Sequence, residues 1–223
     1  MTAAETVGIA LLTLRVALVA TVFAGIPALA IGYALARFRF PGKPLVQTIV
    51  ALPMVLPPVA IGLALLEILS IKSPIGRACE ALFGQTLILT WWAAALASSV
   101  VAFPLIARAA EQAFAAVPVR LENVARTLGC SRPGVFRRVT LPLAARGLLY
   151  GGLFGFARAL GEFGATAMVA GRIPGETETL ALAIYGRIEM FREGEAWILA
   201  GVSLLLALVP TAAAEVFLRR GER

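Results

Sequence analysis

Long apolar runs are the feature that most restricts how this chain can fold. An α-helix needs about 20 apolar residues to cross the hydrocarbon core of a bilayer. The 223-residue sequence is 60% hydrophobic and 15% charged, and its apolar residues gather in stretches of about that length. We therefore predict an all-α, polytopic membrane protein, with one domain over residues 1–223 and about five transmembrane helices. The predicted spans are 16–36, 45–71, 86–107, 143–161 and 196–218.

Two of these runs have limits that are harder to place. Val7–Leu14 is also apolar, but Arg15 separates it from the first run, so we expect an extension near the outer surface. The stretch around the fourth span is too long for one crossing, and Gly161 and Gly164 are the expected break. We interpret 162–195 as a re-entrant or partly buried hairpin, whose backbone must be covered by protein or line a wet cavity.

Lysine and arginine are distributed unevenly between the connections. Thirteen of the twenty lie in or beside 37–44, 108–142 and the C-terminal end, and seven lie in or beside the other connections. Cytoplasmic loops carry an excess of these residues, so the first set is predicted to be cytoplasmic. This orientation places the N-terminus outside and the C-terminus inside. It also explains the net charge of +7 by topology, so nucleic acid is not an expected partner.

Several residue types that enzymes use are absent or scarce. The chain has no histidine, its acidic residues are all glutamate, and Cys79 and Cys130 fall on opposite sides of the predicted membrane. No nucleophile is clustered with a base, and the phosphate-binding pattern Gly-x-x-x-x-Gly-Lys-[Ser/Thr] is missing. We therefore expect no catalytic residues, no metal site, no disulfide and no cofactor bound by this chain, which is not predicted to be an enzyme.

The connection 108–142 carries a helix–turn–helix pattern. A first helix is expected to begin at Pro118 and to stop at Gly129. Its apolar stripe, at positions i, i+3, i+4 and i+7, consists of Leu121, Val124, Ala125 and Leu128. A second helix is expected after the candidate N-cap Ser131, and the unit is predicted to end at Pro142. The pattern permits two interpretations: a hairpin held on the membrane by anionic lipid, or a docking element that receives force from a soluble partner.

This loop resembles the signature of inner-membrane permease subunits of ATP-binding-cassette importers. That signature reads Glu-Ala-Ala, three residues, Gly, nine residues, Ile, one residue, Leu-Pro. Gly129, Val139, Leu141 and Pro142 fit the spacing. The first three slots hold Asn123, Val124 and Ala125. Only the last of these matches, and Glu122 stands one position early, so the sequence departs from the signature at its first slot.

Molybdate permease subunits and their sulfate-permease relatives resemble this chain in two further segments, "ARFRFPGKPLVQTIVALPMVLPPVAIGLALL" and "FARALGEFGATAMVAGRIPGETETLALAIY". The similarity extends over about 11–219. It implies a homodimer of permeases in the bilayer, two cytoplasmic ATPase subunits that bind ATP and magnesium, and an extracytoplasmic molybdate-binding protein. It also implies import of molybdate, and of tungstate, through the inner membrane by alternating access.

The resemblance implies in addition that the loop inserts into a cleft on the ATPase. The expected coupling residues are Leu121, Glu122, Asn123, Ala125, Arg126, Leu128, Gly129, Val139 and Pro142. Two other functions stay open. One is a sulfate or thiosulfate permease subunit, which usually works as two different chains. The other is a stand-alone anion channel or carrier, which needs no docking loop.

The translocation pathway is expected where helices are interrupted. Pro53, Pro57 and Pro58 should bend the second span, because proline removes a backbone donor and kinks a helix. Arg158 and Glu162 are four residues apart, so they either pair with each other or leave Arg158 to contact the oxyanion. The predicted pathway residues are Pro57, Pro58, Arg158, Gly161, Glu162 and Gly164. Selectivity is expected mainly in the separate binding protein.

Small residues form faces of the fourth span. They are Gly151, Gly152, Gly155 and Ala159. Such faces let helices approach closely. We expect packing within one subunit, and a contact between two subunits is the alternative.

Overall fold

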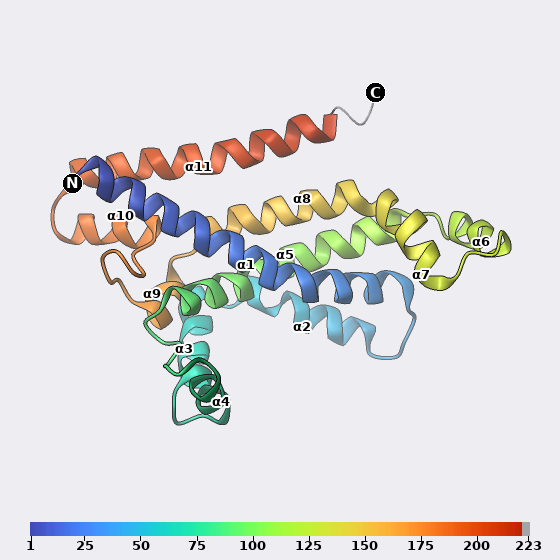
Figure 1. Ribbon diagram of the computed structural model, residues 1–223, viewed down its shortest axis with the longest axis horizontal. Helices are drawn as coiled ribbons and strands as arrows, with labels where there is room; N and C mark the ends of the chain where they lie inside the picture. Colours follow the sequence, from blue (N-terminus) through green and yellow to red (C-terminus); the bar gives the residue numbers. More distant parts are fainter. Residues whose placement is uncertain (220–223) are drawn as a thin grey trace.

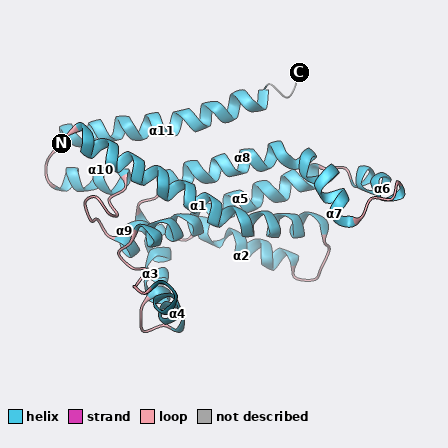
Figure 2. Ribbon diagram, viewed as in Figure 1, coloured by secondary structure: helices cyan, strands magenta, loops and turns pink. Residues whose placement is uncertain are grey.

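The computed structural model describes residues 1–219, and these fold into helices joined by loops (Figures 1 and 2). No strand occurs among them, which confirms the predicted all-α class. In chain order the helices are α1 (Ala3–Arg37), α2 (Lys43–Val55), α3 (Pro58–Leu69), α4 (Pro74–Phe83), α5 (Trp91–Ala116), α6 (Val119–Thr127), α7 (Arg132–Val135), the π-helix η1 (Phe136–Thr140), α8 (Leu141–Leu160), α9 (Gly164–Ala170), α10 (Leu180–Glu189) and α11 (Glu193–Arg219).

The number of membrane spans agrees with the prediction of about five. Four stretches are long and apolar enough to cross a bilayer: α1, α5, the continuous stretch Arg132–Leu160, and Glu193–Ala212 within α11. α2 and α3 together make a fifth candidate, although they are bent by 106° relative to each other. Figure 1 shows α1, α5, α8 and α11 running along the long axis of the molecule, whereas α3 leaves this bundle steeply and carries α4 beyond it.

α1 is one helix of 35 residues, so Val7–Leu14, the expected extension, continues the first span without a break. Arg15 lies within the helix, and its guanidinium lies over the Trp91 ring, 3.7 Å from its centroid, in a cation–π contact. From Arg15 to Arg37 the helix rises about 33 Å, close to the ~30 Å thickness of the hydrocarbon core. The two arginines therefore bound the apolar section of α1.

α5 begins and ends later than the predicted span 86–107. Glu111 stays within the helix because its carboxylate is paired: Arg108 Nη1 lies 3.1 Å from it and Gln47 Nε2 donates to it at 2.7 Å. The pairing allows the helix to continue past a charged residue. The connection predicted over 108–142 is therefore shorter than expected, since α5 occupies its first part.

The second half of the predicted helix–turn–helix is continuous with the fourth span, which corrects the predicted end at Pro142. α7, η1 and α8 form the single stretch Arg132–Leu160. In a regular α-helix proline lacks a donor and its ring collides with the carbonyl four residues earlier. Here the π-helical turn comes just before Pro142, where the Leu141 N–H donates to the Phe136 carbonyl five residues back. The helix widens where proline would otherwise break it.

The segment 162–195 holds two short helices, α9 and α10. α8 ends at Leu160, so the break predicted at Gly161 and Gly164 is present, and Gly164 begins α9. The loop before α10 is closed by the buried Thr177, whose hydroxyl donates to the Gly171 carbonyl at 3.1 Å. These residues therefore form an ordered, partly buried segment beside the bundle.

α11 starts slightly before the predicted span 196–218 and lies at the edge of the bundle (Figure 1). The buried side chains that the structure describes in it, Ala196 and Leu199, lie near its beginning. Further along, the exposed apolar side chains include Leu204, Leu205, Leu208 and Val209. α11 is thus anchored at its N-terminal end and presents an apolar surface along much of its length.

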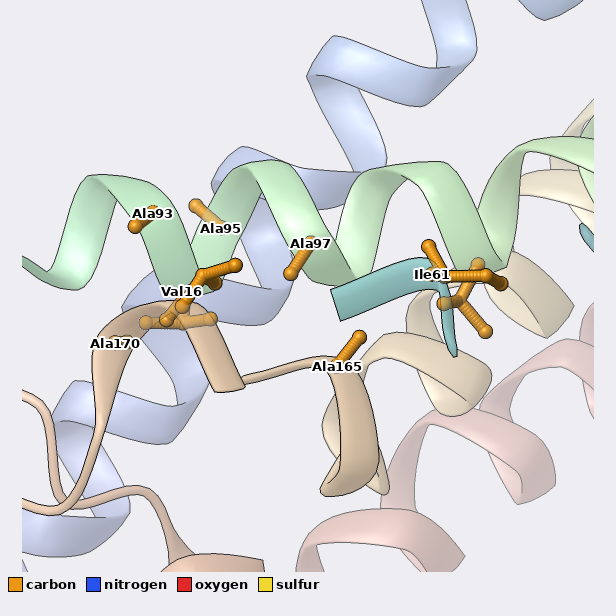
Figure 3. Close-up of a cluster of buried hydrophobic side chains, with 10 residues drawn as sticks. Val16, Ile61, Ala93, Ala95, Ala97, Ala165 and Ala170 are labelled. Atoms are coloured by element: carbon orange, nitrogen blue, oxygen red, sulfur yellow. The ribbon is translucent and has the colours of Figure 1, made fainter. Parts of the chain in front are cut away.

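One part of the core lies where α5 meets α1, α3 and α9 (Figure 3). Its buried residues are Val16, Ile61, Ala93, Ala94, Ala95, Ala97, Val101, Ala165, Val169 and Ala170. Alanine dominates this set, and a short side chain permits backbones to approach closely. The packing here depends on helix proximity rather than on large side chains.

Glycines extend this close packing along α5. A Cβ on Gly32 of α1 would lie 2.6 Å from the Cβ of Ala110. A Cβ on Gly151 or Gly155 of α8 would collide with side chains of α5. Packing within one subunit is therefore confirmed for these two glycines, whereas a Cβ on Gly152 would meet no neighbour within 4 Å.

Candidate functional site

The predicted functional residues gather in two regions of the molecule. One is the loop that carries α6, at the far end of the bundle from the N-terminus (Figure 1). The other is the junction of α3 with α9.

α6 follows Pro118 and ends in a tight turn at Gly129, as predicted. Gly129 has a φ of +87°, in the left-handed region that glycine tolerates best. Its N–H donates to the Arg126 carbonyl, and the next N–H donates to the Ala125 carbonyl, each at 3.0 Å. This is the Schellman pattern of helix ends. Ser131 then caps α7 by accepting an amide hydrogen bond.

The apolar stripe of α6 faces away from the protein. Leu128 is 79% exposed, Val124 is 50% exposed and Leu121 is 41% exposed. Asn123 and Arg126 are exposed beside them, and Ala125 is half-buried. Exposed apolar side chains clustered on one short helix are typical of an interaction surface.

Glu122 lies on the opposite side of α6 and is only 3% exposed. Its Oε1 accepts hydrogen bonds from Arg37 Nη2 and from Thr140 Oγ1, both at 2.7 Å. Arg37 also donates to the Val117 carbonyl at 3.1 Å. We call the group Arg37, Glu122 and Thr140 the Glu122 lock. It joins the end of α1, α6 and η1 through one buried carboxylate, and Arg37 adds a bond to the α5–α6 connection.

Aromatic side chains pack against one another next to the Glu122 lock. Tyr33 of α1 meets Phe114 of α5 and Phe136 of η1 edge to face, with ring centroids 5.2 Å apart in each pair. Phe114 is 1% exposed. These contacts join α1, α5 and η1 beside the Glu122 lock, so α6 packs on a well-fixed base.

The predicted coupling residues are therefore divided in space. Those on α6, together with Gly129, lie at the tip of the loop, whereas Val139 lies in η1 and Pro142 in the first turn of α8. Arg37 and Thr140 were not singled out from the sequence. Their partner Glu122 is 85 positions from Arg37, and a buried pair over that distance leaves no periodic signal.

The helical conformation is interrupted twice near the contact between α3 and α9. Leu56 and Pro57 both have extended backbones, with ψ values of 140° and 131°. Each precedes a proline, and the residue before proline is disfavoured in the helical region. The predicted bend is thus at Pro57 and Pro58, while Pro53 lies within α2. The second break is at 161–163, between α8 and α9.

Glycines bring these two breaks together. A Cβ on Gly164 would lie 2.9 Å from the Cβ of Pro58, and a Cβ on Gly62 would lie 2.7 Å from the Cβ of Met168. α3 and α9 therefore pack with almost no side chain between their backbones. The structure places the predicted pathway residues Pro58 and Gly164 side by side, although they are far apart in sequence.

Arg158 and Glu162 form an ion pair, with Nη1 2.8 Å from Oε2. Glu162 is 2% exposed, and its other oxygen accepts the Ala165 N–H at 2.9 Å. The carboxylate thus neutralises Arg158 and satisfies an amide in the first turn of α9. Of the two alternatives for this pair, the structure has the paired one, and the Arg158 side chain keeps 34% of its surface exposed.

A second ion cluster, which the sequence analysis did not single out, lies at the N-terminal end of the bundle. Arg187 of α10 contacts Glu5 at 2.6 Å, Glu178 at 3.3 Å and Glu195 at 3.0 Å. The Met1 amine lies 2.9 Å from Glu195. We call Arg187 with its three carboxylates the Arg187 cluster. It joins α1, the loop before α10, α10 and α11.

Neither region gathers metal ligands. Within residues 1–219, no three side chains from His, Cys, Asp and Glu are grouped so that they could hold a metal ion. Cys79 of α4 and Cys130 after α6 are both free and half-buried. The chemistry of the two regions is that of ion pairing, hydrogen bonding and close packing.

A protein-family model described as the inner membrane component of binding-protein-dependent transport systems matches residues 28–223. The chain belongs to this family. The match includes both the α6 loop and the α3–α9 junction. Membership makes the chain a multi-pass inner-membrane permease component, and the ATPase of such systems is a separate subunit. The predicted resemblance is confirmed, as is the prediction that this chain is not itself an enzyme.

Individual relatives include proteins of two transport systems. The chain is 41% identical over 200 residues to the molybdenum transport system permease protein ModB of Escherichia coli (strain K12), covering 89% of this chain and 87% of that one. It is 44% identical over 186 residues to the putative molybdenum transport system permease protein YvgM of Bacillus subtilis (strain 168), covering 83% and 82%. It is 34% identical over 197 residues to the sulfate transport system permease protein CysT of Escherichia coli (strain K12), covering 88% and 71%.

The fold is similar to that of a chain in the methionine ABC transporter MetNI, solved in inward-facing conformations. The TM-score is 0.73 at 21% sequence identity, and the superposition covers 99% of each chain. At this identity the likeness concerns the fold. The helical architecture of this family member is therefore that of a transporter permease over nearly its whole length.

Proposed function

We propose that this chain is the transmembrane permease subunit of an ATP-driven importer for molybdate, and also for tungstate. The observation that carries the substrate is the similarity to molybdenum permeases at 41–44% identity over most of the chain, against 34% for the sulfate permease. Molybdate and tungstate are tetrahedral dianions of nearly the same size, so one pathway can pass both. A sulfate or thiosulfate permease is the nearest alternative function.

The proposed complex contains two copies of this chain, two cytoplasmic ATPase subunits that bind ATP and magnesium, and an extracytoplasmic molybdate-binding protein. The family description, which refers to binding-protein-dependent transport, supports the last of these. We place the α6 end in the cytoplasm and the N-terminus outside. The excess of lysine and arginine in the connections at the α6 end supports this orientation.

In this proposal, α6 is the element that docks on the ATPase. Leu121, Val124 and Leu128 supply an exposed apolar face, and the arginines around it offer charge to the partner. The Glu122 lock prevents α6 from moving independently of η1. Because η1 continues into α8 without a break, a displacement of α6 is passed to a membrane-spanning helix.

The α3–α9 junction is the proposed place where this displacement opens or closes the pathway. α8 ends at the 161–163 break, and α9 beyond it packs directly on α3. ATP binding would draw the two docked loops together and open the paired permeases outward, and hydrolysis would reset them inward. Since Glu162 already neutralises Arg158, the anion meets no strong fixed cation there and is not trapped. Selectivity would then lie mainly in the binding protein.

The test is ATP-driven uptake into proteoliposomes that contain this chain, its ATPase and its binding protein. Labelled molybdate, tungstate and sulfate are compared for the wild type and for Leu128→Asp. The matched control is Leu82→Asp on α4, because Leu82 is 80% exposed and Leu128 is 79% exposed. We expect molybdate and tungstate uptake that Leu128→Asp reduces at least about tenfold, since a charge is placed in an apolar contact.

Each of the other results has a defined meaning. Preferential uptake of sulfate would contradict molybdate as the substrate, but it would leave the proposed coupling mechanism in place. Uptake without ATP, unaffected by Leu128→Asp, would make the chain a channel or carrier and would contradict docking through α6. An equal loss in Leu128→Asp and Leu82→Asp would mean that α6 has no special role.

A further inference from the structure

A pocket of about 370 Å³ lies between the end of α1, α6 and the α7–η1 stretch. Three arginines from three different elements line it: Arg37 of α1, Arg126 of α6 and Arg132 of α7. Glu122 is the one acidic side chain among its lining residues. The pocket therefore concentrates positive charge beside the base of the proposed docking helix.

The charge of this pocket is not balanced within the described part of the chain. The Glu122 carboxylate is already bonded to Arg37 and to Thr140. The guanidinium groups of Arg126 and Arg132 have no hydrogen bond or ion pair with any described residue. Arg37 itself keeps an unused donor, because its Nε is buried without a hydrogen-bond partner. Three guanidinium groups thus line a pocket whose one carboxylate pairs with Arg37 and with neither of the other two.

The geometry points to a tetrahedral oxyanion as the ligand of this pocket, and we propose that it binds one there. A guanidinium presents a planar pair of donors that matches phosphate-type oxygens, and such charge-assisted bonds are strong. Arg126 and Arg132 lie on the two sides of the Gly129 turn. An anion bound by both arginines connects α6 to α7 and fixes the angle between these two helices. Arg37, at the end of α1, is the third residue that contacts the anion.

Two sources can supply this chemistry. Arg37 ends the apolar section of α1, so the pocket lies at the level where the phosphate of an anionic phospholipid is found. A free oxyanion, such as inorganic phosphate or the transported molybdate, carries the same oxygens. The inference uses one part of the proposed function, namely the orientation that places the pocket on the cytoplasmic side of the membrane. Binding is measured without transport, so a failure of this inference is distinguishable from a failure of the proposed function.

The experiment measures binding to the full chain, alone and assembled with its ATPase, in nanodiscs. In the first arm, nanodiscs of phosphatidylcholine are incubated with labelled phosphate or labelled molybdate. In the second arm, phosphatidylglycerol is included and the lipids retained by the protein are counted by native mass spectrometry. The test variant is Arg132→Gln. The matched control is Arg137→Gln, which removes the same charge from an exposed neighbour that does not line the pocket.

We expect Arg132→Gln to weaken binding about tenfold or more, because a charge-assisted contact is lost, and Arg137→Gln to change it less than twofold. Binding in the first arm identifies a free oxyanion, and retention in the second arm alone identifies a lipid phosphate. Circular dichroism and thermal unfolding of both variants show whether the fold is kept. A stably folded Arg132→Gln that binds like the wild type would overturn the inference. So would equal effects of the two variants, no binding in either arm, or loss of binding once the ATPase is assembled.

Discussion

The two ends of the bundle neutralise their buried charged side chains in opposite ways. In the Glu122 lock one carboxylate is shared by an arginine and a threonine, and further arginines beside it stay unpaired. In the Arg187 cluster one guanidinium is surrounded by three carboxylates. The first end leaves positive charge and an apolar helix face exposed, whereas the second satisfies its charges within the chain. The comparison indicates that the α6 end is suited to binding another molecule, whereas the charged groups of the α10 end hold helices of the same chain together.

The largest effect is expected from Arg187→Met. Glu178, which is 2% exposed, would lose the cation that neutralises it, and Glu5 would lose its ion pair, whereas Glu195 would keep the Met1 amine. Removing one partner of a buried ion pair costs about 3–5 kcal/mol. The measurement is the free energy of unfolding in mixed micelles. As a control, Arg192→Met removes a 60% exposed arginine that lies 3.8 Å from Glu195, and it should cost less than about 1 kcal/mol. Equal losses in the two variants would show that the cluster does not hold the α10 end together.

Glu122→Gln should have the next largest effect. The amide keeps the size of the side chain but removes the charge that Arg37 faces, so we expect a loss of about 1–3 kcal/mol. Hydrogen exchange over 119–127 should rise more than exchange over α10, because the lock is local to the α6 end. Glu80→Gln on the exposed α4 surface is the control, and it should leave both unchanged. Uniformly faster exchange at both ends would contradict the separation of the two clusters.

Gly129→Ala tests the turn on which α6 depends. At a φ of +87° an alanine side chain is strained by about 1–2 kcal/mol. Thermal unfolding should shift downward accordingly, and ATPase binding should weaken because the hairpin angle changes. Gly152→Ala is the control, since its added Cβ meets no neighbour within 4 Å, and a helical alanine should be neutral or stabilising. The same destabilisation in both variants would mean that the turn conformation is unimportant.

Leu128→Asp should change stability least and partner binding most. The side chain is 79% exposed, so unfolding should shift by less than about 0.5 kcal/mol. Co-purification of the ATPase should nevertheless be lost. A similar loss of the ATPase in Phe191→Asp, a 91% exposed position near the Arg187 cluster, would remove the contrast between the two ends.

Local chemistry explains which parts of this protein were predictable. Gly129 ends α6, Pro118 precedes its start and Ser131 caps α7, because each effect depends on a residue and its immediate neighbours. The Pro57–Pro58 break follows in the same way from the restriction that each proline imposes on the residue before it. The predicted end at Pro142 was wrong because the local preference of proline was overridden by a π-helical turn.

The apolar runs by themselves determined that this is an all-α membrane protein with about five spans, because a bilayer admits few other arrangements of such segments. The loop signature and the two matching segments were likewise enough to place the chain among transport permeases. Only the tertiary structure decided that Glu122 faces inward to Arg37 and Thr140, that Arg187 collects three carboxylates, and that α3 meets α9 through glycines. Each of these contacts joins residues distant in sequence. Their pairing depends on how the helices pack, and no short-range pattern records it.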